Sequence, residues 1–381
     1  MARKKTGKSR PISRRVELSL GKRLLFGTLP ALALLGLGEL GARACWDPET
    51  EQSGDQSTVM APHPTRLWAP REGPHTAFGG SFRINSDLLR AVPTGGQGPR
   101  IITLGDSSIF GHGLEDEWTL HARLQTSLAE AGQTSQVLSG GIPGYSTEQS
   151  LRLMAEWGWK QKPSLLVIGN LWSDGARSSV PDREWYERYG SISSRMDRTL
   201  MEWSQLWTWM RTTSSEQTET PIKLIFERSP EGERRVPLGE YAQNLDRVLQ
   251  QAAEHSVSAV FLSPCHEKLL NDPELYTGLQ STGYFGVMNA VASHRGVPIV
   301  RGCDVLRLAG IERREVAFVQ MDPHRPELGN DPLHPSGNSN SAYASAITMV
   351  LIEAGWPTQG LIPRSDVGAF SQSIPLGPED L

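Results

Sequence analysis

The stretch from Pro99 to Gly113, PRIITLGDSSIFGHG, constrains the fold of this chain more than any other. Its first part, Arg100 to Leu104, is a run of β-branched and apolar residues, which is typical of a buried strand. The run ends at Gly105-Asp106-Ser107, so a glycine turn places a serine at the carboxyl end of that strand. This edge of a sheet is where α/β proteins carry their functional groups.

Two interpretations of Ser107 are open from this stretch alone. A serine at a strand end acts as a nucleophile when a base, an oxyanion site and a group that orients the base lie nearby. Asp and Ser are also ordinary N-cap residues, so Asp106-Ser107-Ser108 equally fits the start of a helix near Ile109. Partners elsewhere in the chain must decide between the two.

Beyond Arg100 the pattern alternates between strands and helices. Leucines at helical spacing predict a helix over Thr119–Ala131, and Ser146 or Thr147 is expected to cap another helix after the turn GGIPGYST. Strand, helix, strand, helix, strand predicts an α/β fold with a doubly wound parallel sheet flanked by helices. Further strands are expected at 137–138, 164–169, 259–262 and 298–300, and further helices at 241–254, 284–293 and 340–353.

From about Asp182 to Pro237 an insertion with the character of a cap interrupts this alternation. Between Ser194 and Arg211, apolar and aromatic residues recur at helical spacing. Such a stripe fits core packing, a cap over the site or a surface that rests on a bilayer. Ile222–Phe226 and Glu233–Val236 are expected to form a hairpin. The stripe consists of Met196, Leu200, Trp203, Leu206, Trp207 and Met210.

Positive charge is concentrated at the amino terminus. Residues 1–23 hold nine basic residues and one acidic residue, whereas the remainder holds 29 basic and 41 acidic residues. A body this acidic is a poor nucleic-acid binder. The basic segment leads into Leu24–Gly38, an uncharged apolar run that is short for a bilayer span.

We interpret residues 1–23 as a cytoplasmic tail and 24–45 as an uncleaved signal anchor, with cleavage next to Ala42-Arg43-Ala44 as the alternative. The protein is then expected in a bacterial inner membrane, crossing it once, with its body on the periplasmic or extracellular side.

The rest of the chain divides into three parts. Residues 46–98 are rich in Pro, Gly and His and are expected to form an irregular lead-in arm. Residues 99–360 form the α/β domain, and 361–381 form a carboxyl-terminal tail. Cys265 and Cys303 each follow an expected strand. They can form a disulfide if the body is exported, and two free thiols are the alternative.

A second candidate group lies in Asn330-Asp331-Pro332-Leu333-His334-Pro335. On this proline-bracketed turn, the Asp331 carboxylate can accept from one ring nitrogen of His334 while the other nitrogen faces outward. Alone, the pair is more typical of an ordinary surface turn that leads into the next helix. With Ser107 it supplies the base and the orienting group that a nucleophilic serine requires.

In their order along the chain, these blocks resemble the SGNH, or GDSL, hydrolase family. The blocks are Gly105-Asp106-Ser107, Gly144 in the turn IPGYST, the segment LWSD after the third strand, and Asp331-x-x-His334, all within residues 100–355. FRINSDLLR before the first strand is similar to the lead-in of membrane-anchored bacterial members. The resemblance implies a flavodoxin-like, three-layer fold.

The resemblance also implies the roles of the site residues. Ser107 is the expected nucleophile, His334 the general base and Asp331 the residue that orients it. The backbone N–H groups of Ser107 and Gly144 are expected in the oxyanion hole. Where the family places Asn before Asp, this chain has a serine, so Ser173, or alternatively Asn170, is expected to supply a side-chain donor.

The implied function is an exported serine esterase or O-acyl hydrolase that forms an acyl-enzyme on Ser107. Its expected partners are a membrane and an ester-bearing small molecule, glycan or lipid, with acyl esters of envelope glycans or lipids as substrates. An O-acyltransferase with the same triad and a catalytically impaired glycan-binding scaffold are the alternatives.

Neither a metal nor a cofactor is expected, because no Cys and His spacing resembles a zinc site and the glycines at 105, 111 and 113 lack dinucleotide-binding spacing. His112, His121 and His266, which lie near predicted strand ends, are expected to be packed or solvated.

Overall fold

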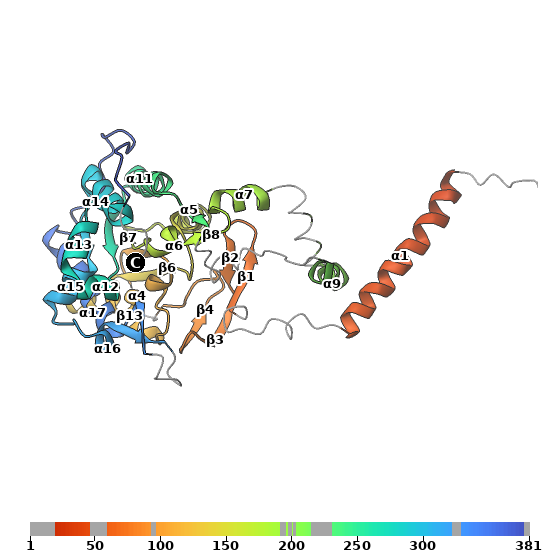
Figure 1. The fold of residues 1–381 in the computed structure, drawn as a ribbon, viewed down its shortest axis with the longest axis horizontal. Coiled ribbons are helices and arrows are strands. Elements are labelled where there is room, and N and C mark those ends of the chain that lie inside the picture. The colour runs from red at the N-terminus through yellow and green to blue at the C-terminus, as the bar shows by residue number, and fades with distance from the viewer. Residues whose placement is uncertain are drawn as a thin grey trace, which may run out of the picture. The chain divides into compact units, whose positions relative to one another are not determined.

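The protein is described here by a computed structural model of residues 1–381. It describes residues 20–45, 59–92, 97–190, 203–214, 231–321 and 329–376, together with 196 and 200. Within them the chain divides into two units. Helices α1 (Leu20–Cys45) and α9 (Gln205–Ser214) belong to the smaller unit, and the larger unit holds the sheet and the remaining helices (Figure 1).

A five-stranded parallel sheet forms the centre of the larger unit, in the order β11-β10-β7-β5-β6. If the strands are numbered along the chain from β5 and the sheet is read from the β6 edge, this is the flavodoxin-like order 2-1-3-4-5. The chain moves from β5 to β6 on one side and resumes at β7 on the other, so a topological switch point lies between β5 and β7. The predicted doubly wound α/β fold is confirmed. The strands are β5 (Arg100–Gly105), β6 (Gln136–Gly141), β7 (Leu165–Ile168), β10 (Ser258–Ser263) and β11 (Ile299–Arg301).

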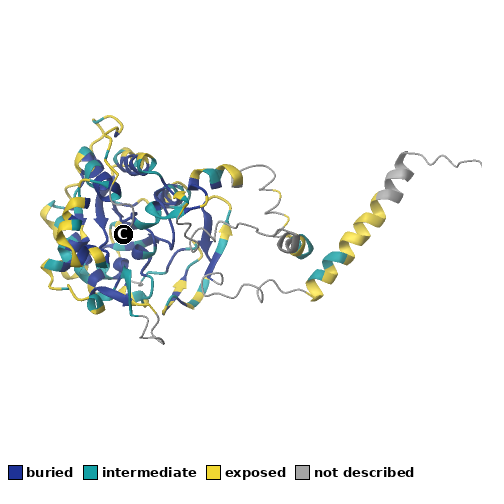
Figure 2. Ribbon diagram, in the orientation of Figure 1, coloured by how far each residue is buried: buried dark blue, intermediate teal, exposed yellow. Residues whose placement is uncertain are grey.

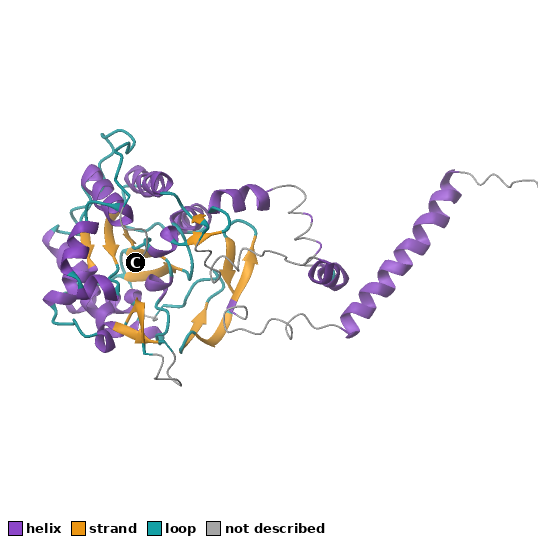
Figure 3. Ribbon diagram, viewed as in Figure 1, coloured by secondary structure: helices purple, strands orange, loops and turns teal. Residues whose placement is uncertain are grey.

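Helices pack on both faces of this sheet (Figure 3). One layer contains α4, α15 and α17, and the other contains α5, α11 and α14. The helix ends follow the sequence signals: Thr119 caps α4, and the amide of Ser146 donates to Gln149 Oε1 at the start of α5. The long helices are α4 (Leu120–Glu130), α5 (Thr147–Glu156), α11 (Leu238–Glu254), α14 (Gly283–Arg295) and α17 (Gly337–Glu353). The shorter ones are α3 (Ser107–Phe110), α6 (Trp172–Gly175), α7 (Asp182–Gly190), α12 (Glu267–Asn271), α13 (Pro273–Leu279), α15 (Gly302–Leu308) and α16 (Arg314–Ala317), with 3₁₀ turns at Asp116–Trp118 and Gly158–Gln161.

The core lies at the sheet, where every residue of β7 and β10 is buried (Figure 2). Strands covered on both faces carry continuous apolar sequence rather than alternation, as these do. Glycine allows one close approach at the edge of this core. A Cβ built on Gly141 would lie 2.7 Å from the backbone nitrogen of Phe110, so Gly141 lets the short helix α3 lie directly against β6.

The lead-in arm is more regular than the sequence predicts. Two antiparallel hairpins form, one from β1 and β2 and the other from β3 and β4. All four residues of β2 are buried, so its sequence lacks the alternation that marks a half-exposed strand. The strands are β1 (Met60–His63), β2 (Leu67–Pro70), β3 (Gly73–Ala77) and β4 (Gly80–Ile84).

The two ends of the insertion meet each other, on the strand for which the sequence predicts a hairpin with 222–226. β9 (Glu233–Arg234) pairs antiparallel with β8 (Arg177–Ser178), and the amide of Asp182 donates to the carbonyl of Arg235 at 2.8 Å. The proposed partner strand, 222–226, lies outside the described residues. The pairing that forms closes a loop of about fifty residues, which no local pattern reveals.

In the smaller unit, α1 and α9 contact each other through Glu39. Its carboxylate accepts from Ser204 Oγ and from the amides of Gln205 and Leu206, at the first turn of α9. Among the residues described, no helix has the length and apolar content needed to cross a membrane. Four residues of the apolar stripe are exposed, which excludes core packing for them: Met196, Leu200, Trp203 and Met210.

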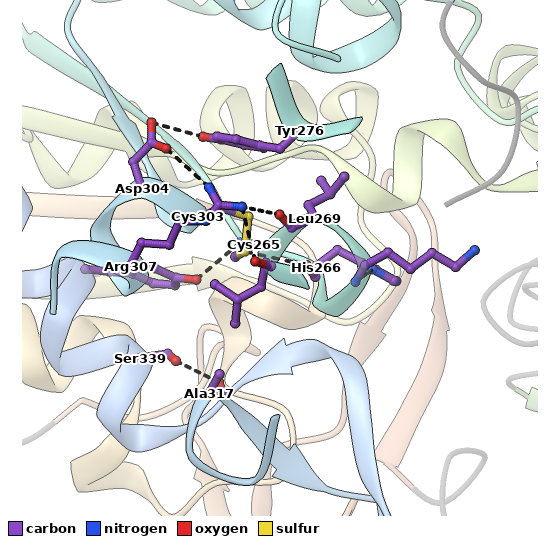
Figure 4. Close-up of a disulfide and its surroundings, with 12 residues drawn as sticks. Cys265, His266, Leu269, Tyr276, Cys303, Asp304, Arg307, Ala317 and Ser339 are labelled. Atoms are coloured by element: carbon purple, nitrogen blue, oxygen red, sulfur yellow. Dashed lines mark hydrogen bonds and ion pairs between the residues drawn. A yellow bond between two sulfur atoms is a disulfide. The ribbon is translucent and has the colours of Figure 1, made fainter. Parts of the chain in front are cut away.

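A disulfide joins Cys265 and Cys303, with their Cα atoms 4.7 Å apart (Figure 4). Cys265 follows β10, and Cys303 follows its neighbour β11. Because parallel neighbours end at the same edge of a sheet, the two cysteines lie close together, and the disulfide alternative is confirmed.

Candidate active site

Asp106 holds the turn at the end of β5. Its Oδ1 accepts from the amide of Ser108 at 3.0 Å and so caps α3. Its Oδ2 accepts from the amides of Trp172 and Ser173, at 3.1 and 3.2 Å, in the segment after β7. The fully buried carboxylate therefore ties the turn that carries Ser107 to the loop on the other side of the switch point. Helix capping and a nucleophilic serine are compatible here.

The structure brings Ser107, His334 and Asp331 together at this turn. His334 Nε2 lies 2.7 Å from Ser107 Oγ, and His334 Nδ1 lies 2.9 Å from Asp331 Oδ2. The pair lies on a short strand, β13 (Asn330–Pro335), which pairs antiparallel with β12 (Phe318–Gln320), where the sequence predicts a turn. Asp331 Oδ1 still accepts hydrogen bonds from the amides of Leu333 and His334, at 2.7 and 2.9 Å, as in a turn.

Asp331 stays ionised in this setting. Burial acts to raise the pKa of its carboxyl, but the hydrogen bond and charge of His334 and two backbone amides outweigh burial and hold the pKa well below its usual range. A carboxylate beside Nδ1 favours the tautomer that carries its proton there. The lone pair of Nε2 is then directed at the Ser107 hydroxyl.

A second imidazole, that of His112, packs on the ring of His334. The ring of His112 stacks on the ring of His334, with the ring centroids 4.2 Å apart. The ring of Phe78 also stacks on His112, with centroids 4.5 Å apart. Burial, and then the proximity of His334, lower the pKa of His112 well below 6.5, so its ring is neutral. His112 is packed, as expected, but nothing in the sequence pattern indicates that it packs against His334.

Two backbone amides, those of Ser107 and Gly144, are the candidates for the oxyanion hole. Gly144 lies in the loop between β6 and α5 with φ of +76°, a conformation that glycine adopts without strain. Within the described part of the chain, the amides of Ser107 and Gly144 have no acceptor. Both are therefore available to donate to an oxygen that becomes negative.

Ser173 and Asn170 occupy different surroundings. The amide of Ser173 is held by Asp106, and its side chain is half-buried. The Asn170 side chain lines a small cavity with Thr147 and Leu151 of α5, and neither its Oδ1 nor its Nδ2 has a partner among the described atoms. A side-chain contribution from Ser173 to the oxyanion hole stays a prediction.

Asp174 joins the same loop to α5. Its Oδ1 accepts from the amide and the hydroxyl of Thr147, at 2.9 and 2.6 Å. Burial raises the pKa of the Asp174 carboxyl to about 7, although the Thr147 bonds act in the opposite direction. The start of α5, directly after the Gly144 loop, is thus fixed to the segment after β7.

The segment FRINSDLLR places a buried arginine, Arg90, against the backbone that follows Ser107. Arg90 donates to the carbonyls of Phe110, Gly111 and Leu114 and pairs with Asp116 at 2.8 Å. These contacts hold the backbone that leaves α3, so the lead-in arm supports the turn that presents Ser107.

This arrangement is suited to acyl transfer. His334 can take the proton of Ser107, Asp331 can stabilise the imidazolium, and two amides can stabilise the oxyanion. No group of three or more His, Cys, Asp or Glu side chains in the described ranges is placed to hold a metal ion.

Solved structures of hydrolases are similar to this chain. A lipase/acylhydrolase from Enterococcus faecalis is 13% identical, with 67% of this chain and 95% of that chain covered and a TM-score of 0.40. A protein assigned to the lipolytic G-D-S-L family from Desulfitobacterium hafniense is 14% identical, with 67% and 100% covered and a TM-score of 0.39. An acetylxylan esterase from Geobacillus stearothermophilus is 16% identical, with 69% and 97% covered and a TM-score of 0.41.

No family model matches the sequence, and no curated protein matches it. The solved structures are of the kind that the sequence resemblance implies. The three-layer fold of this chain follows from its own strand order and from the helices on both faces of its sheet.

The raised pKa of the Asp174 carboxyl predicts that the stability of the folded protein depends on pH. In the unfolded chain the Asp174 carboxyl loses its proton near pH 3.8, whereas in the folded protein it keeps the proton up to about pH 7. Stability is therefore lost as pH rises through this window, by up to about 1.4 kcal/mol per pH unit. We expect the free energy of unfolding of the wild type, relative to Asp174→Asn, to fall from about pH 4 to about pH 7 and then level off. Denaturant titrations across this range measure the difference, and parallel curves would contradict the assignment.

Proposed function

We propose that this chain is a serine ester hydrolase of the SGNH/GDSL type. The observation that carries the proposal is the 2.7 Å contact between His334 Nε2 and Ser107 Oγ, with Asp331 behind the imidazole. A serine hydroxyl paired in this way with a base is activated for attack on an acyl carbon. The three side chains are half-buried, so the site is open to an incoming ester.

The reaction proceeds in two halves. Ser107 Oγ attacks the ester carbonyl while its proton passes to His334 Nε2, and the carbonyl oxygen becomes an anion held by the amides of Ser107 and Gly144. The tetrahedral species then expels the alcohol, which takes the proton from His334 and leaves an acyl group on Ser107. Water, deprotonated by His334, attacks the acyl-enzyme, and the second tetrahedral species expels Ser107 Oγ, which takes this proton back from His334 as the acid is released.

Acyl esters of envelope glycans or of lipids are the substrates we propose, because they are the esters that an exported enzyme meets. A series of p-nitrophenyl esters from acetate to octanoate separates the two groups. A preference for acetate supports glycan O-acyl groups, and a preference for octanoate supports lipid esters.

Ser107→Ala is expected to lower p-nitrophenyl acetate hydrolysis by about a thousandfold or more, because the acyl-enzyme can no longer form. Ser345→Ala, the same substitution at an exposed position of α17, is the matched control and should keep the wild-type rate. A fluorophosphonate probe should label the wild type and the control but not Ser107→Ala. Equal rates in all three proteins without labelling would indicate a non-catalytic scaffold.

We propose further that the body is exported and held at the membrane by residues 24–45. The Cys265–Cys303 disulfide supports this, because disulfides persist in oxidising compartments. The basic segment 1–23, followed by the apolar run, supports a cytoplasmic amino terminus.

Fractionation of bacterial cells that express the full chain tests this location. The protein should sediment with membranes, and protease added to spheroplasts should digest its body. A body that stays protected from the protease would contradict export, and a body in the soluble fraction with a new amino terminus near Cys45 would show cleavage instead of anchoring.

A further inference from the structure

The loop that carries Gly144 is held by side chains from outside the α/β core. Trp68, in the lead-in arm, donates its indole N–H to the carbonyl of Pro143 at 3.0 Å. The Pro143 carbonyl and the Gly144 N–H belong to one planar peptide unit and point in opposite directions. The bond from Trp68 therefore sets the direction of the N–H that is expected to stabilise the oxyanion.

The next peptide unit is held from the insertion. Arg235 Nη1 donates to the carbonyl of Gly144 at 2.6 Å. Glycine has the widest freedom of φ and ψ, so a single anchor would leave the loop free to rotate at Gly144. With the peptide units on both sides fixed, φ and ψ of Gly144 are fixed as well.

Arg235 is itself tightly held. Its Nε and Nη2 donate to the two carboxylate oxygens of Asp182, each at 2.9 Å, and Nη2 also donates to Gln149 Oε1 at 2.9 Å. Its guanidinium lies 5.3 Å from the centre of the Trp68 ring. Arg235 and Trp68 are 1% and 0% exposed. A buried ion pair with this many partners cannot swing away without leaving charges unpaired.

We propose that Trp68 and Arg235 are positioning residues for the oxyanion hole: by holding the carbonyls of Pro143 and Gly144 they aim the Gly144 N–H at the substrate oxygen. This inference rests on the proposed ester hydrolysis at Ser107. The lead-in arm, which carries Trp68, and the insertion, which carries Arg235, then have a common role, because each contributes one of the two side chains that hold the Gly144 loop.

Two substitutions test the proposal. Trp68→Phe removes the indole donor but keeps an aromatic ring, and Arg235→Lys keeps the charge beside Asp182 but removes the fork that reaches Gly144. Each is expected to lower kcat for p-nitrophenyl acetate by about tenfold or more, with little change in KM, because the oxyanion forms only after binding.

A thionoester substrate gives a readout that a purely structural role would not change. Sulfur accepts hydrogen bonds more weakly than oxygen, so an oxyanion hole favours the ester over the matching thionoester. In both variants the ratio of kcat/KM for ester to thionoester should fall towards one. Unchanged ratios would overturn the proposal.

A second buried pair in the chain supplies the matched control. Arg295 donates Nε and Nη2 to the carboxylate of Asp246, at 2.6 and 2.8 Å, and is 2% exposed. Arg295→Lys should lower the thermal midpoint as Arg235→Lys does but keep kcat and the ester preference. If Arg235→Lys does not fold, Asp182→Asn, compared with Asp246→Asn, tests the same anchor with the same readouts.

The outcomes separate this inference from the proposed function. If the wild type neither hydrolyses the ester nor reacts with the fluorophosphonate at Ser107, the proposed function fails. If the wild type is active but Trp68→Phe and Arg235→Lys match Arg295→Lys in kcat and ester preference, only the positioning role fails.

Discussion

The hydrogen bond between Ser107 and His334 is the contact on which the rest of the site depends. It joins the first residue of α3 to a residue of β13 that lies 227 residues further along the chain, at a distance of 2.7 Å. Proton transfer requires that the two atoms stay within hydrogen-bond reach. The sheet makes this possible by ending β5 and β7 at one switch point. β13 brings the histidine to that edge, and the stacked ring of His112 supports the imidazole from one side.

Buried charged side chains hold the backbone at this edge. Asp106 accepts amides from both sides of the switch point, Arg90 donates to the carbonyls that follow α3, and Arg235 donates to Gly144. Loops cannot be fixed by hydrophobic burial alone, because their peptide groups need partners. In this protein Arg90 and Trp68 of the lead-in arm and Arg235 of the insertion supply several of those partners.

The sheet was predictable from local signals, and Ser107, Asp331 and His334 were predictable because short blocks in a recognisable order carry them. Apolar runs closed by glycine mark the strands, and Asp331-x-x-His334 shows its pair at a fixed spacing. The partners of the loops were not predictable. β8 and β9 pair across the insertion, Trp68 meets Pro143 from 75 residues away, and Arg235 meets Gly144 from 91. His112 gave no signal either, since stacking on His334 depends on a distant strand. Such contacts are created by the fold, and no periodicity or motif records them.

A crystal structure of the protein after inactivation by an organophosphonate tests the central claim most directly, because the tetrahedral phosphorus imitates the reacting carbon. We expect a phosphorus bonded to Ser107 Oγ and a phosphoryl oxygen about 3 Å from the amides of Ser107 and Gly144. A phosphorus on another residue, or a phosphoryl oxygen turned away from the Gly144 amide, would contradict it.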